Sequence, residues 1–524
     1  MPPAPIPNSA HIQATEFLQV ASQFHLGALP TESRHAKTKN LSRLSQTDLE
    51  SALKLLHEVE ISALDGAFAN AGQELIDLTK AIELTWAGGG RVFLCGCGAT
   101  GRLSVSLEAL WRKDALKQSR TNEADRVVSF IAGGDYALVR SIENFEDHPE
   151  YGAQQLRDLG FENNDLLIAI TEGGETPFVI GAAHEAASIS RYATWFLFCN
   201  SKESLAGLSR SREMFEHPRV RSVSLPTGPM ALAGSTRLQA STVLMLAVGA
   251  ALTAAQKHSS AEIEIQNFRS RLIETDFTAL APLIEREAEA YAKGKRCVHV
   301  ADEHAVTVLT DTTERSPTFS IAPFENELNP DDRVSWTYLS IPSCETAAAA
   351  WESLLMRSPR ALTWKSVAKK FDQSVISGFN FSREALPRRQ KAVGAPLVYS
   401  VESANGFLNL SIGGRSATID AQGSRLTEHL ILKCAMNMSS TLVMGRLGRF
   451  ESNLMLFVKA SNNKLIDRSL RFIALLLADR GLSYSYEEIC YALFEIRATL
   501  DAEESIVLKT LEHFTRKSGQ GLTA

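Results

Sequence analysis

The 524-residue chain is too long for one ordinary hydrophobic core, so we expect about two to four domains. Hydrophobic residues make up 44% of it and charged residues 22%, which is typical of a globular protein and excludes a disordered or fibrous one. The formal net charge is −6 and no basic tract dominates, so the composition argues against a nucleic-acid-binding protein.

The sequence also indicates how the protein is targeted and in which redox state its cysteines are kept. The first residues, MPPAPIPNSAHIQ, lack a charged segment followed by an apolar core, so we expect no secretory signal. The longest apolar runs, such as residues 244–252, are too short to span a bilayer. Seven scattered cysteines without a CxxC pair favour buried reduced thiols over disulfides or a metal site. These features predict a cytoplasmic protein with no membrane partner.

In chain order, a polar, proline-bearing start over residues 1–40 precedes an amphipathic helical segment over 42–90, which the triple glycine at 88–90 ends. Apolar strands then alternate with helices, which predicts a parallel sheet covered on both faces. The predicted strands span residues 91–96, 127–134, 164–171, 194–200 and 221–226. A long helix over 236–256 closes this unit.

A second round of the same pattern begins near residue 265. A helical stretch over 270–295 precedes a strand over 296–302, and further strands are predicted at 334–341, 361–367, 396–401 and 407–412. From about residue 425 the chain is mainly helical. We therefore predict an α/β protein of two three-layer αβα domains with parallel sheets, plus helical N- and C-terminal segments. The expected boundaries are 1–60 for an N-terminal helical extension, 61–262 and 263–470 for the two domains, and 471–524 for a C-terminal helical cap.

The turn after the first strand suits an anion. Gly96, Gly98 and Gly101 give the spacing G-x-G-x-x-G, and Thr100 adds a hydroxyl where the next helix begins. Glycines let the backbone approach a ligand, and free N–H groups at a helix start favour negative charge. The alternative is a turn needed only for chain geometry, since this spacing alone is a weak signal.

Two more turns repeat this layout. Thr171, Gly174 and Thr176 lie between a strand and a helix, but Glu172 and Glu175 in the same turn would repel a phosphate. Either these carboxylates point away, or they bind hydroxyls or an amine of the ligand. Another hydroxyl-and-glycine turn, residues 234–236, contains Ser235 and has helix capping as its alternative role. The acidic run at 143–150 is either a solvated face or the source of a functional carboxylate.

Taken together, these stretches resemble the sugar-isomerase (SIS) domain family that contains N-acetylmuramic acid 6-phosphate etherase and glucokinase regulatory protein. The resemblance spans roughly residues 30–470. The stretches that carry it are TESRHAKTKNLSRLS at 31–45, GCGATGRLS at 96–104, IAGGDYALVRSIENFEDHPEYG at 131–152, TPFVIGA at 176–182, TGPMALAGSTRLQA at 227–240 and LGRFESNLMLFVKASNNKL at 447–465. Chain length and the second α/β unit resemble the two-domain, regulatory-protein branch.

The resemblance implies a phosphorylated hexose or amino sugar as ligand and neither a metal nor a nucleotide cofactor. It places Thr100 at the position of a phosphate-binding serine, Thr171 at a second hydroxyl, and Lys433 at a phosphate-binding lysine from the second domain. The sugar-phosphate site that it implies comprises Gly98, Thr100, Gly101, Glu146, Thr171, Gly174, Thr176, Ser235 and Lys433. A sugar-kinase partner is an open alternative, and the chain is expected to be a monomer with paired SIS domains or a homodimer.

In the etherase, two glutamates serve the acid–base steps of an elimination. The resemblance places the first at position 110, where this chain has Leu110, and the second at Glu146. Glu108 lies two positions before Leu110, about 200° around a helix, so it should face elsewhere. We therefore predict a sensor or regulator that binds a sugar phosphate. The alternatives are an enzyme, either an etherase (a carbon–oxygen lyase) or a sugar-phosphate isomerase with Glu146 as base, and a scaffold that binds only protein.

Overall fold

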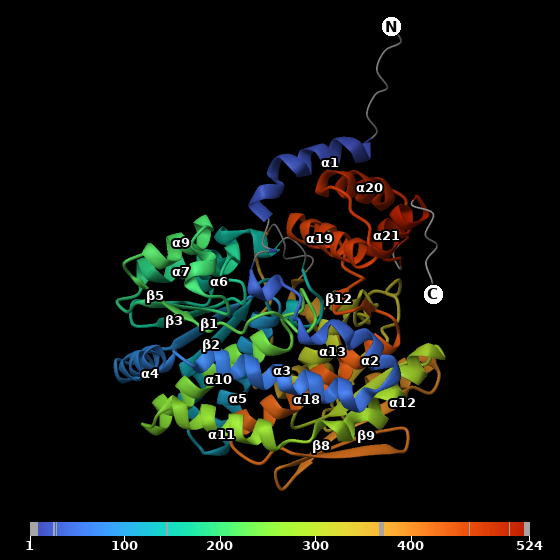
Figure 1. Ribbon diagram of the computed structural model, residues 1–524. Coiled ribbons are helices and arrows are strands. Elements are labelled where there is room, and N and C mark those ends of the chain that lie inside the picture. The colour runs from blue at the N-terminus through green and yellow to red at the C-terminus, as the bar shows by residue number, and fades with distance from the viewer. Residues whose placement is uncertain are drawn as a thin grey trace.

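The structure is a computed structural model that describes residues 9–24, 27, 29–142, 145–365, 371–460, 462–501 and 504–517. Glu143, part of the acidic run considered above, lies outside the described residues. Two five-stranded sheets with their helices form the body of the molecule, and a helical cap lies at one end of it (Figure 1).

The first sheet is parallel throughout and confirms the five predicted strands. Its order is β2-β1-β3-β4-β5. The strands are β1 (Val92–Gly96), β2 (Val127–Ile131), β3 (Leu166–Ile170), β4 (Thr194–Phe198) and β5 (Val220–Ser224). The helices are α4 (Gly72–Ala87), α5 (Ala99–Lys117), α6 (Pro149–Asp158), α7 (Pro177–Ile189), α8 (Lys202–Leu205), α9 (Ser209–Glu216) and α10 (Gln239–Lys257).

Alternate residues of these strands belong to two separate apolar clusters. Phe93 and Leu167 pack with residues of α6 and α7, whereas Leu94 and Ile168 pack with the cluster that includes α5 and α10. Figure 1 shows α6, α7 and α9 on one side of this sheet and α5 and α10 on the other. Burial on both faces explains why the strands are continuous apolar runs.

The second sheet differs from the prediction. Its order is β10-β9-β8-β6-β7, and only β7, β6 and β8 are parallel. The strands are β6 (Cys297–Ala301), β7 (Thr337–Ser340), β8 (Leu397–Ala404), β9 (Phe407–Ile412) and β10 (Arg415–Asp420). The expectation of a purely parallel sheet is wrong here because two tight hairpins follow β8. Residues 361–365 of the expected strand at 361–367 are not in a strand.

The hairpins have a local cause. Asn405 and Gly406 join β8 to β9, and Gly413 and Gly414 join β9 to β10. All four residues have φ between +53° and +82°. A two-residue turn of this kind needs positive φ at both positions, which glycine and asparagine tolerate best, and it matches the twist of antiparallel strands.

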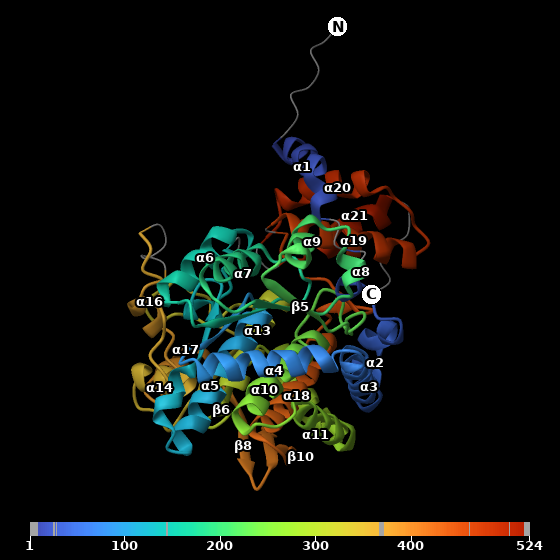
Figure 2. The ribbon, with the colours of Figure 1, turned by 90° about the vertical axis from the view of Figure 1, so that its left-hand side faces the viewer.

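Helices from both units pack together between the two sheets (Figures 1 and 2). They include α3 (Leu49–Phe68), α10, α11 (Ala261–Glu274), α12 (Ala281–Ala292), α13 (Ala305–Phe319) and α18 (Arg425–Arg446). By length and composition α10 alone among the described helices could cross a membrane, but 89% of its apolar window is buried inside the protein. Its hydropathy therefore reflects a central core position.

The remaining elements are peripheral. The helical segment predicted at 42–90 is three helices, α2 (Leu41–Thr47), α3 and α4. The cap combines α1 (Ser9–Val20) with α19 (Asn463–Asp479), α20 (Tyr486–Arg497) and α21 (Ile506–Lys517), as Figure 1 shows at the top. Other short elements are α14 (Ala347–Leu355), α16 (Gln373–Ser377), α17 (Ala385–Val393), β11 (Phe450–Glu451) and β12 (Leu454–Met455). The 3₁₀ turns are η1 (Ala21–Phe24), η3 (Pro30–Glu32), η4 (Lys37–Asn40), η5 (Thr121–Arg126), η6 (Asp135–Leu138), η7 (Phe145–Asp147) and η8 (Phe277–Leu280).

Candidate functional site

A cavity of about 330 Å³ lies where the turns after β1 and β3 meet the segment before α10 and the start of the cap. The three hydroxyl-and-glycine turns contribute Gly98, Thr176 and Ser235, and η7 contributes Glu146. The cap closes the opposite wall with residues around Lys464. The carboxyl ends of parallel strands are the usual place for a ligand in such folds, because the helix N-termini converge there.

The first turn places only its backbone in the cavity. Gly98 lines it with φ of +55°. The Thr100 hydroxyl instead donates to the Cys97 carbonyl and accepts from the Cys97 amide, both at 2.9 Å, so it braces the turn. A Cβ on Gly101 would lie 2.3 Å from a side-chain carbon of Ile131, which shows that this glycine permits close packing of α5 on β2. Thr100 and Gly101 therefore shape the turn from behind.

In the second turn Thr176 lines the cavity and Thr171 lies beneath it. Their hydroxyl oxygens are 2.9 Å apart, and the Gly174 amide donates to the Thr171 hydroxyl at 3.3 Å. Glu175 is neutralised by Arg210 at 3.0 Å. Glu172 lines the cavity, with one carboxylate oxygen accepting from the Thr236 hydroxyl at 3.2 Å.

Glu172 is a cavity carboxylate whose pKa is raised to near neutrality. Burial raises its pKa from 4.5 to about 7, although the charge of Lys464 and the hydrogen bond from Thr236 oppose that shift. A carboxyl group with a pKa near neutrality can both donate and accept a proton under cellular conditions. The sequence analysis left its role open, and the fold turns it towards the ligand space.

Lys433 is not in this cavity. Its ammonium group, on α18, donates to the carbonyls of Arg237 and Leu238 at 2.8 and 3.3 Å and to the side chains of Thr242 and Asn437 at 2.9 and 3.1 Å. It does reach from the second unit to the first, but it binds backbone just before α10. The geometry makes Lys433 a residue that positions the third turn.

Lys464, which the sequence analysis missed, lines the cavity from the start of α19. Burial alone would lower its pKa, but the carboxylates of Glu146 and Glu32 outweigh burial and raise it. Glu32 is already paired with Arg468 at 2.8 Å. The available signal was the C-terminal stretch KASNNKL, which carries two lysines near a helix start.

Glu146 lies on η7 with few polar contacts. Its carboxylate accepts a hydrogen bond from the Cys97 thiol at 3.5 Å, and the described part of the chain offers it no ion pair within 4 Å. Burial raises the pKa of the Cys97 thiol, so the thiol stays protonated and remains a donor. Glu146, Glu172 and Lys464 thus line one cavity, and among the described residues neither of these glutamates has an ion pair such as those of Glu32 and Glu175.

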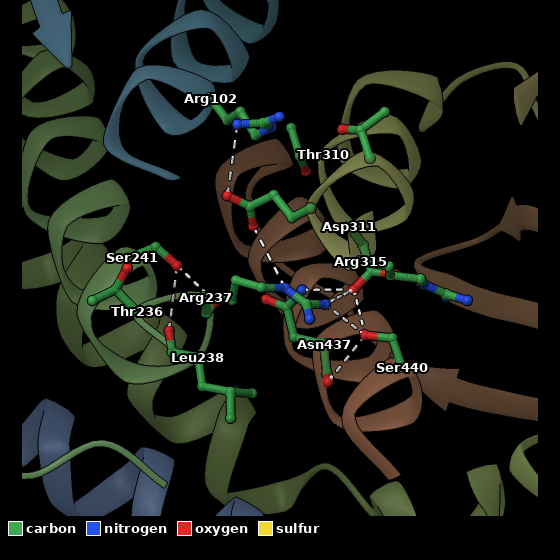
Figure 3. A network of polar contacts seen from close by, with 12 residues as sticks. Arg102, Thr236, Arg237, Leu238, Ser241, Thr310, Asp311, Arg315, Asn437 and Ser440 are labelled. Atoms are coloured by element: carbon green, nitrogen blue, oxygen red, sulfur yellow. Dashed lines mark hydrogen bonds and ion pairs between the residues drawn. The ribbon is translucent and has the colours of Figure 1, made fainter. Parts of the chain in front are cut away.

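A basic wall completes the cavity (Figure 3). Arg102 and Arg237 lie 3.9 and 3.6 Å from the two carboxylate oxygens of Glu314. Buried nitrogens remain without a hydrogen-bond partner among the described residues, namely Arg102 Nε and Arg237 Nε and Nη1. Asp311 and Ser440 hold one nitrogen of Arg237, so the unpartnered nitrogens of Arg102 and Arg237 are the donors that could meet an anion.

The other glutamate considered in the sequence lies elsewhere. Glu108 is buried against Arg112, Arg357 and Arg360 at 3.0, 3.2 and 2.8 Å. Burial opposes ionisation, but these guanidinium groups hold the pKa of Glu108 at about 2. Leu110 is 7% exposed and belongs to the core. Neither residue lines the cavity, as the helical spacing predicts for Glu108.

Comparison with known proteins identifies relatives of this chain. Residues 74–187 match the family model described as the glucokinase regulatory protein N-terminal SIS domain. The N-acetylmuramic acid 6-phosphate etherase of Aliivibrio fischeri strain MJ11 is 27% identical over 289 residues, 54% of this chain and 89% of that protein. N-acetylmuramic acid 6-phosphate etherase 1 of Bacillus licheniformis is 32% identical over 235 residues, 44% of this chain and 69% of that protein.

Among solved structures, tagatose-6-phosphate ketose/aldose isomerase from Escherichia coli aligns with a TM-score of 0.42 and 11% identity. The alignment covers 78% of this chain and 97% of that chain.

Proposed function

The chain belongs to the SIS-domain family that includes the N-acetylmuramic acid 6-phosphate etherases, and on that basis we propose that it binds a phosphorylated amino sugar and cleaves an ether bond in it. The family relationship makes it a sugar-phosphate-related SIS protein. The etherase activity is the finer proposal, and it ranks above the regulatory role that the sequence alone favoured.

The observation that carries this proposal is that Glu146 and Lys464 line one cavity and interact electrostatically there without forming an ion pair. Glu146 has no ion pair within 4 Å among the described residues, so a base is available where a sugar would lie. Elimination of an ether needs a base that takes the proton from the carbon beside the one that carries the ether oxygen. An isomerase would use the same carboxylate to move a proton between adjacent carbons.

The phosphate has a natural place at the turns. Lys464 supplies charge, and the hydroxyls of Thr176 and Ser235 and the backbone at Gly98 supply hydrogen bonds. In this arrangement Thr100, Gly101, Thr171 and Gly174 support the turns from behind, and Lys433 holds the segment before α10. A phosphorylated substrate also suits the cytoplasmic location predicted from the sequence.

A regulator that binds a sugar phosphate without turnover is the second candidate. Two observations favour it, the match of residues 74–187 to the regulatory-protein SIS model and Leu110 at the position of the first etherase glutamate. A sugar-kinase partner belongs to this candidate alone. Pairing of the two α/β units within one chain supports a monomeric site, with a homodimer as the alternative.

The decisive experiment measures D-lactate released from N-acetylmuramic acid 6-phosphate by the wild type and by Glu146→Gln, with thermal unfolding of the same samples. The expected result is release by the wild type alone, with ligand-dependent stabilisation of both proteins. Stabilisation without release would overturn the etherase and leave the regulator or isomerase. Neither release nor stabilisation would overturn sugar-phosphate binding itself.

A further inference from the structure

We propose that Glu172 is the proton-donating group of this cavity, protonated when ligand is bound and placed to serve as the general acid that position 110 does not supply. This inference rests on the proposed function for its catalytic part. Its binding part concerns any phosphorylated sugar that enters the cavity.

The carboxylate of Glu172 is hydrogen-bonded within the fold but has no ion pair among the described residues. Thr236 donates to Oε1 at 3.2 Å, and the backbone of Glu172 itself also hydrogen-bonds to the carboxylate. The side chain lines the same cavity as Glu146 and Lys464, and it comes from the turn after β3 rather than from α5. A carboxyl group that is held in place by hydrogen bonds and lines the cavity can offer its proton to a ligand when it is protonated.

Charge in the cavity favours the protonated form. Glu32, Glu175 and Glu314 face arginines of the same cavity within 4 Å, whereas Glu146, Asp147 and Glu172 have no such ion pair among the described residues. Lys464 is a cation that acts on all three of them electrostatically. A sugar phosphate adds a charge of about −1.5 to −2 at neutral pH, which would repel an ionised Glu172.

Glu172 is the group best able to accept the compensating proton. Burial raises its pKa to about 7, so protonating this carboxylate at pH 7–8 costs little free energy. The titratable and charged groups that face it from the surrounding elements are Cys97, Glu146, Cys199, Arg237, Glu314 and Lys464. Burial raises the pKa of both thiols well above their usual range, and nearby carboxylates raise the pKa of Lys464.

Two carboxyl groups account for every proton moved in the proposed elimination, one as base and one as acid. Glu146 takes the proton from the carbon beside the ether carbon, the C–H electrons form a carbon–carbon double bond, and the C–O bond breaks. The departing oxygen takes the proton of Glu172. Glu146 ends protonated and Glu172 ends ionised, with no oxidant or other co-reactant. Removing such an acid lowers kcat by about 10²–10⁴-fold in other enzymes.

The test is calorimetric titration of the wild type, Glu172→Gln and Asp147→Asn with N-acetylglucosamine 6-phosphate at pH 8. Buffers of different ionisation enthalpy report the protons taken up. Asp147 is the matched control, because it lines the same cavity and burial raises its pKa as well. We expect uptake approaching about one proton per ligand in the wild type and Asp147→Asn, and none in Glu172→Gln.

Each outcome of the titration supports or contradicts one of the two proposals. No uptake by the wild type, or unchanged uptake in Glu172→Gln, would overturn the inference while sugar-phosphate binding stands. Uptake that depends on Glu172 without lactate release would keep the protonated contact and overturn its catalytic role together with the etherase. Absence of binding by the wild type would overturn both proposals. Equal thermal midpoints of wild type and Glu172→Gln at pH 5, where both side chains are neutral, verify that the variant folds.

Discussion

Arg237 and Asp311 form a buried ion pair of 2.6 Å that joins the third turn of the cavity to helix α13 of the second unit. Figure 3 shows the network around it, in which Asp311 also meets Arg315, Asn437 and Ser440. The residues just before Arg237 line the cavity. The second unit thus holds one wall of the site without lining most of it.

Asp311→Asn should destabilise the whole protein. The guanidinium groups of Arg315 and Arg237 outweigh burial and hold the pKa of Asp311 at about 2. Removing one partner of such a buried pair costs about 3–5 kcal/mol. Denaturant unfolding measures the loss, and the exposed pair Asp65–Arg269 gives the control, because Asp65→Asn should cost less than about 1 kcal/mol. Equal losses in the two variants would show that the network adds nothing.

Lowering the pH should also reveal how much the buried carboxylates stabilise the folded protein. Because the pKa of Asp311 is depressed, its stabilising contribution is present above its unfolded pKa of about 4 and is lost as pH falls towards about 2. Glu108, with a pKa of about 2, acts in the same direction. The free energy of unfolding should therefore fall between pH 4.5 and pH 2 with a shallower slope in Glu108→Gln than in the wild type. Parallel slopes for the two proteins would contradict this account.

Lys464→Met should weaken ligand binding with little effect on folding. Lys464 lines the cavity and makes no hydrogen bond to a described residue, so its loss removes charge that faces the ligand and, from within the fold, only its electrostatic attraction to Glu146 and Glu32. A hydrogen bond to a charged group is worth about 1.5–3 kcal/mol, so we expect affinity for N-acetylglucosamine 6-phosphate to fall by about 10–150-fold. Titration calorimetry measures it. Wild-type affinity in this variant would remove Lys464 from the site.

Lys433→Met should show the reverse pattern. Its four hydrogen bonds are internal. Ser241 and Thr242 would still donate to the carbonyls of Arg237 and Leu238, but the variant leaves the buried Asn437 Oδ1 without its donor. Each orphaned buried group costs about 1–3 kcal/mol. Denaturant unfolding should therefore detect a clear loss of stability. Loss of ligand affinity at unchanged stability would instead restore the direct phosphate contact that the sequence resemblance implies.

The two lysines show which part of the site could not be predicted from the sequence alone. Alternating apolar strands and helices predicted the first sheet strand by strand, because a sheet buried on both faces needs continuous apolar runs. Glycine turns placed the cavity at the strand ends. Which of Lys433 and Lys464 faces it depends on how α18 and α19 pack, and no local pattern encodes that packing. The antiparallel hairpins did have a local signal, Asn405-Gly406 and Gly413-Gly414 between alternating strands, which favours tight turns.

Glu172→Gln should change stability only at high pH. The folded pKa of about 7 lies above the usual value of 4.5, so the favourable contribution of the neutral group is full below pH 4.5 and is lost as pH rises through 7. At pH 8 the wild type therefore carries an ionised group in the cavity, and the variant does not. With screening by water in the cavity, we expect the variant to be more stable by on the order of 1–3 kcal/mol at pH 8 and equal at pH 4.5. Denaturant unfolding at both pH values measures the difference, with Glu285→Gln, an exposed position in the middle of α12, as control. A difference of the same size at both pH values would mean that the amide changes packing and that proton binding at Glu172 is not linked to folding.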